Sequence, residues 1–227
     1  MPRLLLEVIV QTVEDARAAT EGGADRLEVV RAIRDGGLTP SMETVRDIRG
    51  ATSLPLRVMV RENPGYTTSA EELDTLRAAA KDLSAIGVDG IVLGYARDGV
   101  LALGDVVGVL EAAPDMKATF HRAFDVLRDP LVAIDMLSEI PQIDRILTNG
   151  GDGPAAVRCA RLHRYSMRAR NRFAIVAGGG VDEQGLTLFA RTECVGEVHV
   201  GRAARQDGNP EAPVCLARVQ HLRQLAG

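Results

Sequence analysis

ADRLEV at residues 24–29 is the first of four six-residue stretches that superpose without gaps along this chain of 227 residues. The other three are VDGIVL (88–93), IDRILT (143–148) and VGEVHV (195–200). They alternate with four further apolar, β-rich runs, namely LLLEVIV (4–10), PLRVMVR (55–61), KATFHR (117–122) and RFAIVAGGG (172–180). The eight runs recur at an average spacing of about 27 residues, the length of one strand, one helix and two short loops.

The segments between these runs carry the start signals of helices. Ser41 precedes METVRDI, and Ser69 with Glu72 forms a capping box before LDTLRAAAKDL. Because strands that are each followed by a helix are parallel, the pattern predicts an α/β fold, a single-domain (β/α)8 TIM barrel over residues 1–227. The alternative is an open doubly wound sheet, but no GxGxxG follows the first strand, where a dinucleotide-binding fold would carry it.

Composition and charge exclude several classes of protein. Hydrophobic residues make up 46% of the chain and charged residues 26%, which is typical of a globular protein. The net charge is −4, and the 25 arginines and two lysines are scattered among 31 acidic residues, so we expect no nucleic-acid partner. No apolar run approaches the roughly 20 residues that span a bilayer, and the first run is too short for a signal peptide. We therefore expect no membrane contact and a cytoplasmic location.

Polar residues at strand ends indicate where a TIM barrel would carry out chemistry, because active sites of this fold lie there. Arg57 and Arg61 share the strand face opposite the aliphatic residues of their run, so we expect both to point into the barrel. The same alternation gives four more inward positions, Glu7, Glu28, Asn149 and His199. The fifth strand ends in FHRAFD, which supplies a base, a cation and an acid: His121, Arg122 and Asp125.

These residues are typical of general acid/base chemistry on a small anionic substrate. Glu7 or Glu28 would act as the acid or base, with His121 as its proton partner. Arg61 and Arg122 would bind the anionic groups of the substrate. The alternative is a buried ion network, in which the same carboxylates and arginines only neutralise one another.

Other catalytic strategies fit the sequence less well. A Schiff-base enzyme needs a lysine at the mouth of the barrel, but Lys81 falls in the third helix and Lys117 at the N-terminal end of the fifth strand. Cys159 and His163 stand four residues apart on a predicted helix, yet no third metal ligand lies in reach along the sequence. The residues thus predict no cofactor, leave the presence of a metal open, and fit a lyase or isomerase without a Schiff-base lysine.

The number and spacing of the cysteines argue against disulfides and against a zinc site. The three cysteines, Cys159, Cys194 and Cys215, are odd in number and widely spaced. They fit neither a disulfide framework nor a zinc knuckle.

Glycine-rich turns follow the seventh and eighth strands. Three glycines, Gly178, Gly179 and Gly180, end the seventh run, and Gly201 precedes Arg202 after the eighth. In TIM barrels these two loops commonly present backbone N–H groups to a phosphate, so the turns predict a phosphate or anion site. The alternative is that both are tight turns that simply require a positive φ.

Seven motifs at strand ends occur together in this chain: LLEV (5–8), GGADRLEV (22–29), GGLTPS (36–41), FHRAFD (120–125), ILTNG (146–150), AGGGV (177–181) and EVHVG (197–201). In this combination the sequence resembles the CutC family, named for copper homeostasis, over essentially the full chain. The resemblance implies a (β/α) barrel with a role in copper homeostasis, and copper is the only cofactor it implies. The matching positions are Glu7, Glu28, Arg61, His121, Arg122, Asp125 and the turn at 178–180.

The resemblance also implies where copper ligands would stand. Members of the family usually carry a cysteine two residues after the first-strand glutamate and another two residues after the second-strand glutamate. In this chain those positions hold Ile9 and Val30, and aliphatic side chains do not bind Cu(I).

Three functions are therefore compatible with the sequence. The resemblance implies a cytoplasmic protein of copper homeostasis, whereas the residues favour a metal-independent enzyme that acts on a small anionic substrate, with or without a phosphate group. A non-catalytic barrel that binds such a ligand is the third. The sequence leaves open the substrate, the reaction type and whether the chain forms a homo-oligomer.

Overall fold

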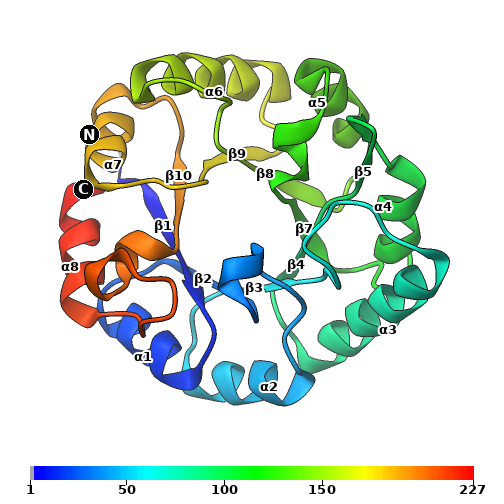
Figure 1. The fold of residues 1–227 in the computed structure, drawn as a ribbon, viewed down its shortest axis with the longest axis horizontal. Helices are drawn as coiled ribbons and strands as arrows, with labels where there is room; N and C mark the ends of the chain where they lie inside the picture. The colour runs from blue at the N-terminus through cyan, green and yellow to red at the C-terminus, as the bar shows by residue number, and fades with distance from the viewer. Residues whose placement is uncertain (1–2) are drawn as a thin grey trace.

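The computed structural model describes residues 3–227 and contains a closed barrel of eight parallel strands (Figure 1). Their bounds are β1 (Leu5–Val10), β2 (Arg26–Val29), β3 (Leu56–Met59), β4 (Gly90–Leu93), β7 (Lys117–Phe120), β8 (Ile143–Thr148), β9 (Ala174–Ala177) and β10 (Glu197–Val200). The strands neighbour one another in this order, and β10 pairs with β1 to close the barrel. Each run identified in the sequence forms one of these strands, so the predicted (β/α)8 barrel is confirmed.

Eight α-helices surround the barrel within residues 3–227 (Figure 1). They are α1 (Val13–Glu21), α2 (Met42–Ala51), α3 (Ala70–Ile86), α4 (Leu103–Leu110), α5 (Pro130–Ser138), α6 (Ala155–Ala169), α7 (Glu183–Thr192) and α8 (Leu216–Leu225). Both predicted helix starts are confirmed. The Ser41 side chain accepts a hydrogen bond from the N–H of Thr44, and Ser69 and Glu72 make the reciprocal bonds of a capping box. These side chains satisfy N–H groups that a first helical turn leaves without partners.

The hydrophobic core lies between the strands and the helices. In β1, Leu6 and Val8 are fully buried and belong to the same apolar cluster as Ile48 of α2 and Leu83 of α3. Glu7 stands between these two β1 residues and therefore points to the opposite face of the strand, into the barrel. The interior of the barrel is thus the place where polar side chains collect.

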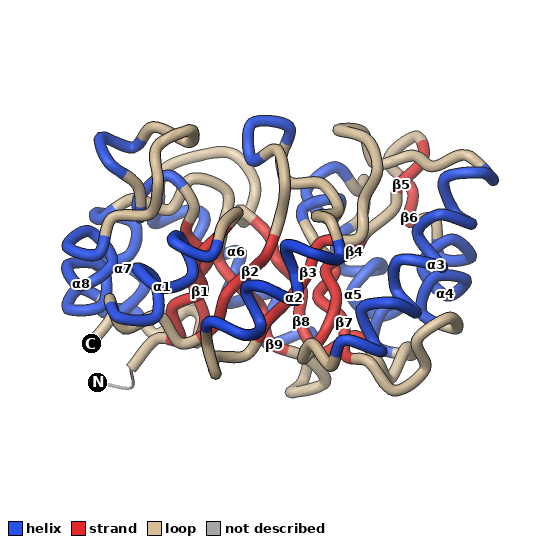
Figure 2. Tube along the Cα trace, turned by 90° about the horizontal axis from the view of Figure 1, so that it is seen from below, coloured by secondary structure: helices blue, strands red, loops and turns tan. Residues whose placement is uncertain are grey.

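Short elements that the sequence did not predict cover one end of the barrel. They are a two-stranded antiparallel sheet, β5 (Ala96–Arg97) and β6 (Val100–Leu101), and four 3-10 turns, η1 (Ile33–Asp35), η2 (Arg122–Val126), η3 (Arg202–Ala204) and η4 (Gln206–Gly208). Figure 2 shows loops and turns on this side of the strands and the two ends of the described chain on the other. No helix within residues 3–227 is both long and apolar enough to cross a membrane.

Candidate functional site

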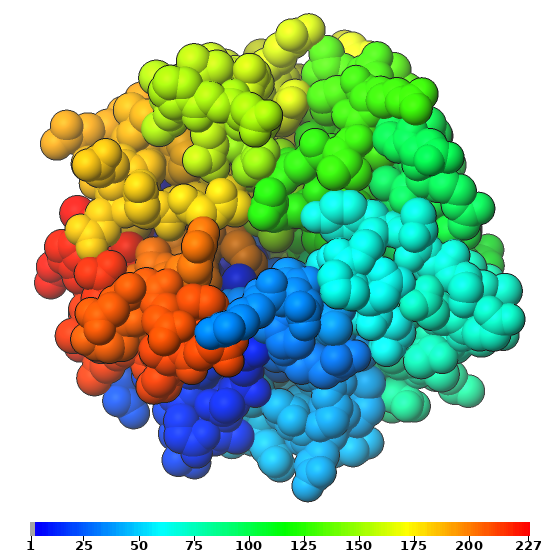
Figure 3. Space-filling view, viewed as in Figure 1, coloured from blue at the N-terminus to red at the C-terminus, as the bar shows by residue number. Residues whose placement is uncertain are grey.

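A cavity of about 610 Å³ opens at the C-terminal end of the barrel, where active sites of this fold are found. Figure 3 shows the hollow at the centre of this face. Its polar wall consists of Glu28, Arg34, Asp35, Arg61, Tyr66, His121, Arg122, His199 and Arg202. At one side of the opening, η1 approaches the segment after η4. Arg34 of η1 and Glu211 of that segment form an ion pair, with 2.5 Å between Nε and Oε1.

Two glutamates from neighbouring strands meet one histidine at the base of the cavity. The register sets Glu7 of β1 opposite His199 of β10. His199 Nδ1 lies 2.7 Å from Oε1 of Glu7 and 3.6 Å from Oε2 of Glu28. Glu28 Oε2 is buried and has no hydrogen-bond partner among residues 3–227. Glu28 and His199 form part of the cavity wall, whereas Glu7 does not reach it.

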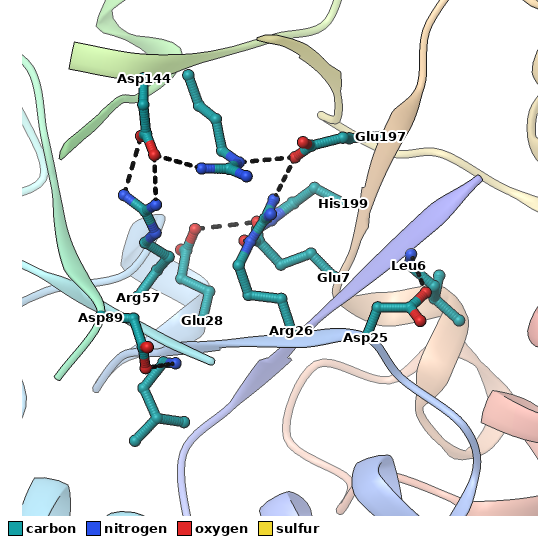
Figure 4. Close-up of polar contacts among 12 residues, drawn as sticks. Leu6, Glu7, Asp25, Arg26, Glu28, Arg57, Asp89, Asp144, Glu197 and His199 are labelled. Atoms are coloured by element: carbon teal, nitrogen blue, oxygen red, sulfur yellow. Dashed lines mark hydrogen bonds and ion pairs between the residues drawn. The ribbon is translucent and has the colours of Figure 1, made fainter. Parts of the chain in front are cut away.

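On the N-terminal side of these residues a chain of ion pairs crosses the barrel (Figure 4). Successive members of the chain are Glu7, Arg26, Glu197, Arg145, Asp144 and Arg57. The four contacts after the Glu7–Arg26 pair measure 2.5–2.8 Å. Arg57 thus points into the barrel as predicted, but it belongs to this ion chain rather than to the cavity wall. A buried ion network therefore describes this layer of the barrel.

The two glutamates have different protonation behaviour. Burial alone would raise the pKa of Glu7, but Arg26 and His199 hold that pKa well below its ordinary value. Burial raises the pKa of Glu28 to about 7, with Glu7 adding to the effect and His199 opposing it. Burial alone would lower the pKa of His199, yet the facing carboxylates of Glu28 and Glu7 raise it. Glu7 is therefore a permanent anion, whereas Glu28 exchanges a proton near neutral pH.

His121 stands at the opposite wall of the cavity, directly after β7. Its Nδ1 accepts a hydrogen bond from the N–H of Ala123 at 3.1 Å. Its Nε2 is buried and has no partner among residues 3–227. Burial lowers the pKa of His121 to about 3, and the charges of Arg61 and Arg122 act in the same direction. The ring is therefore neutral at physiological pH.

Positive charge dominates the cavity wall. Its charged members are four arginines, Arg34, Arg61, Arg122 and Arg202, and two acids, Glu28 and Asp35. Arg34 and Arg122 pair with Glu211 and Asp125, which lie outside the wall, whereas Arg61 and Arg202 make no ion pair within residues 3–227. Arg61 is fixed in place, because its guanidinium donates to the carbonyl groups of Gly36, Pro64 and Gly65.

The glycine turns after β9 and β10 both reach the cavity. Gly179 and Gly180 have φ values of +71° and +84°, so both adopt the positive φ that a tight turn would require. A Cβ on Gly179 would lie 2.8 Å from Asn149 Cβ, and one on Gly201 would lie 2.8 Å from Ile9 Cδ1. Within residues 3–227 the N–H groups of Gly179 and Gly180 make no hydrogen bond. Gly178 is different, because its N–H donates to Thr148 and it does not line the cavity.

Two further predicted site residues lie outside the cavity wall and hold the loops around it. Asp125 accepts hydrogen bonds from Thr148 Oγ1 at 2.6 Å and from the N–H of Asn149 at 3.1 Å, and it pairs with Arg122. Asn149 Oδ1 accepts from the N–H of Gly151 at 2.6 Å. The structure therefore brings Glu28, Arg61, His121, Arg122 and His199 together and places Asp125 and Asn149 behind them.

The sequence profile of the CutC family matches residues 4–204. The chain belongs to the CutC family. Among curated proteins of the family, a copper homeostasis protein cutC homolog of Homo sapiens is 30% identical over 205 residues, covering 89% of this chain and 75% of the relative. A CutC family protein of Agrobacterium fabrum is 35% identical over 214 residues, covering 93% of this chain and 84% of the relative.

A solved CutC structure has the same fold. The crystal structure of the putative copper homeostasis protein CutC from Streptococcus agalactiae superposes with a TM-score of 0.79 at 22% identity. The match covers 86% of this chain and 97% of that chain. At this identity the likeness shows the fold alone.

The residues of this CutC barrel do not fit a Cu(I) site, because Cu(I) prefers thiolate and thioether ligands. Among residues 3–227, the cavity wall contains one thioether, Met59, and no cysteine, and Ile9 and Val30 contribute aliphatic surface to it. The cysteines stand in the helix layer, Cys159 in α6, Cys194 after α7 and Cys215 before α8. Burial, together with the neighbouring Cys159, raises the pKa of Cys194 to about 12, so its thiolate is disfavoured.

Another cation site is suggested by geometry alone. Within residues 3–227, ligand atoms of Glu7, Glu28 and His199 all lie within 4.8 Å of one another. Arg26 already neutralises Glu7, and the Nδ1 of His199 is engaged by the same carboxylate. Two of the three side chains, Glu7 and His199, are therefore already engaged with each other or with Arg26.

Sequence reasoning missed part of the CutC cavity wall. Arg34 and Tyr66 line it from the loops after β2 and β3. The first loop carries the motif GGLTPS (36–41), and Tyr66 ends the stretch RENPGY (61–66) in the second. The Tyr66 ring lies 5.5 Å from the His121 ring, and Arg61 Cζ lies 5.0 Å from the centre of the Tyr66 ring. The glycines in these two loops were the sequence signal that could have indicated this part of the wall. Strand alternation could not, because it does not orient side chains beyond the end of a strand.

Proposed function

We propose that this CutC family member is an enzyme that carries out acid/base chemistry on a small anionic substrate, with a phosphate group bound by the turns after β9 and β10. One observation carries the proposal. Glu28 Oε2 and His121 Nε2 are both buried without a hydrogen-bond partner in the described chain, and both side chains line the same cavity. These are the atom types that donate and accept protons or hydrogen bonds during catalysis.

Leaving such atoms unsatisfied is costly. A buried polar group without a partner destabilises a fold by about 1–3 kcal/mol, so unpartnered groups gathered in one cavity favour a ligand that satisfies them. The ion-network alternative does not account for this pair. His121 makes no ion pair within residues 3–227, and Glu28 approaches the ion chain only through His199, at 3.6 Å and without a hydrogen bond.

Charge selects the class of substrate. Arg61 and Arg202, the two wall arginines without an ion pair within residues 3–227, favour an anion. Arg122 and Arg202 lie close to Gly179 and Gly180, whose N–H groups make no hydrogen bond within the same residues. A Cβ on Gly179 would lie 3.0 Å from Arg122 Cζ, and one on Gly180 would lie 3.9 Å from Arg202 Nη2. Backbone N–H groups without partners and two nearby guanidinium groups are well suited to a phosphate.

Copper homeostasis is the function in the names of the relatives. The cavity offers no thiolate, so we propose the enzyme rather than a copper carrier. We propose a cytoplasmic location, because three free cysteines are typical of a protein in a reducing compartment.

The experiment is a thermal-shift series with inorganic phosphate and small sugar phosphates. A ligand at one hundred times its dissociation constant should stabilise the fold by about 2.7 kcal/mol. Gly179→Ala should abolish this stabilisation, because its Cβ meets Asn149 and Arg122 and its φ is positive. Gly104→Ala is the matched control, since its Cβ meets nothing within 4 Å, and Arg202→Gln removes one cation from an exposed position.

The outcomes distinguish the hypotheses. Stabilisation of wild type and of Gly104→Ala, with loss in Gly179→Ala and weakening in Arg202→Gln, supports the anion site. No response of wild type at millimolar ligand would refute it. Binding without turnover of any sugar phosphate would favour the non-catalytic barrel.

A further inference from the structure

The geometry points to a specific reaction class: we propose that the protein enolises a phosphorylated carbonyl compound, with Glu28 taking the proton from the carbon next to the carbonyl group and neutral His121 donating a hydrogen bond from Nε2 to the carbonyl oxygen. This inference rests on the proposed acid/base function and its anion site. It adds the chemical class of the substrate and a distinct role for each residue.

The backbone determines the tautomer of His121. An amide N–H can only donate, so Nδ1, which accepts from the N–H of Ala123, carries a lone pair. The proton of the neutral ring therefore lies on Nε2, the buried atom without a partner. The ring packs closely against Gly94, where a Cβ would lie 2.6 Å from Nδ1, and its centre lies 5.5 Å from that of the Tyr66 ring.

The surroundings of His121 keep it neutral. Arg61 approaches from the loop after β3 and Arg122 follows it in η2, and both are positive. Two neighbouring cations and full burial disfavour a second proton on the ring. His121 is then a hydrogen-bond donor at every physiological pH, which differs from the proton-partner role expected from the sequence.

The structure separates the two candidate glutamates. Glu7 is held by Arg26 and His199 and is not part of the cavity wall. Glu28 lines the cavity, and its Oε2 accepts no hydrogen bond within residues 3–227, since the nearest charged group, His199 Nδ1, lies 3.6 Å away. Glu28 is therefore the base, and Glu7 with Arg26 positions His199 beside it.

The step balances without a co-reactant. The bond between carbon and hydrogen breaks, the proton moves to the Glu28 carboxylate, and the electron pair forms a carbon–carbon double bond. The carbonyl oxygen takes the negative charge, which the Nε2–H of His121 stabilises. Glu28 then returns the proton to carbon, and no metal, oxidant or reductant is consumed.

Deuterium exchange tests the reaction directly. Full-length protein is incubated in D2O with dihydroxyacetone phosphate or glycolaldehyde phosphate, and deuterium at the carbon next to the carbonyl is followed by proton NMR. Wild type should accelerate exchange, and Glu28→Gln and His121→Leu should each slow it about 100-fold or more. Glu21→Gln and His163→Leu are matched controls at exposed positions and should exchange like wild type.

A second measurement does not depend on choosing the right substrate. Nitrogen-15 NMR of histidine-labelled protein should show His121 protonated on Nε2 and unprotonated on Nδ1 from pH 5 to 9, with no titration. A proton on Nδ1, or titration within this range, would overturn the proposal.

The combined results separate this inference from the proposed function. Phosphate stabilisation without deuterium exchange on either probe overturns the enolisation step and leaves the anion site standing. Absence of both effects overturns the two together.

Discussion

Replacing Glu28 by glutamine should change how the stability of the protein depends on pH. In the folded state burial raises the pKa of Glu28 from 4.5 to about 7, so the fold keeps a proton that the unfolded chain releases between these values. The free energy of unfolding of wild type therefore falls as the pH rises through this window. A glutamine side chain does not ionise, so the Glu28→Gln variant lacks this loss.

The size of the effect follows from the two pKa values. Each pKa unit corresponds to about 1.36 kcal/mol, so ionising the buried carboxyl group costs the fold about 3 kcal/mol once the pH exceeds 7. Relative to wild type, Glu28→Gln should therefore gain about 3 kcal/mol of stability between pH 4.5 and pH 8.

The assay is urea unfolding of both proteins at pH 4.5, 6 and 8, followed by circular dichroism. Glu21→Gln, at the exposed end of α1, is the matched control and should track wild type at each pH. A difference between wild type and Glu28→Gln that stays constant across the three pH values would show that Glu28 ionises normally. The assignment of Glu28 as the proton-exchanging group would then be refuted.

Two further predictions follow from the ion chain and from the cysteines. Arg26→Met leaves the buried carboxylate of Glu7 and the partly buried carboxylate of Glu197 without their shared guanidinium, so the free energy of unfolding in urea should fall by about 3–5 kcal/mol, whereas Arg17→Met at an exposed position should change it little. A loss below about 1 kcal/mol for Arg26→Met would contradict the role of this pair. In competition with a Cu(I) chelator, wild type should hold copper no better than an ordinary protein with three cysteines. Tight stoichiometric binding that survives replacement of Cys159, Cys194 and Cys215 by serine would disprove this and restore copper handling.

Strand alternation oriented the site residues well wherever a strand continued to its end. Glu28, Arg57 and His199 point into the barrel as predicted, because successive side chains of a strand must face opposite sides. Beyond the strand ends the alternation no longer applies. Asp125 and Asn149 were expected at the site, and they instead hold the turns behind the cavity wall.

The sequence by itself determined the barrel, its eight strands and the helix starts, because repeat length, alternation and capping are local properties of neighbouring residues. It could not distinguish Glu7 from Glu28, which are the same residue type on adjacent strands. That distinction comes from Arg26 and its partner Glu197, 171 positions away along the chain, and from His199 on the strand that closes the barrel. A pKa depends on burial and on the distance to other charges, and only the folded chain sets those distances.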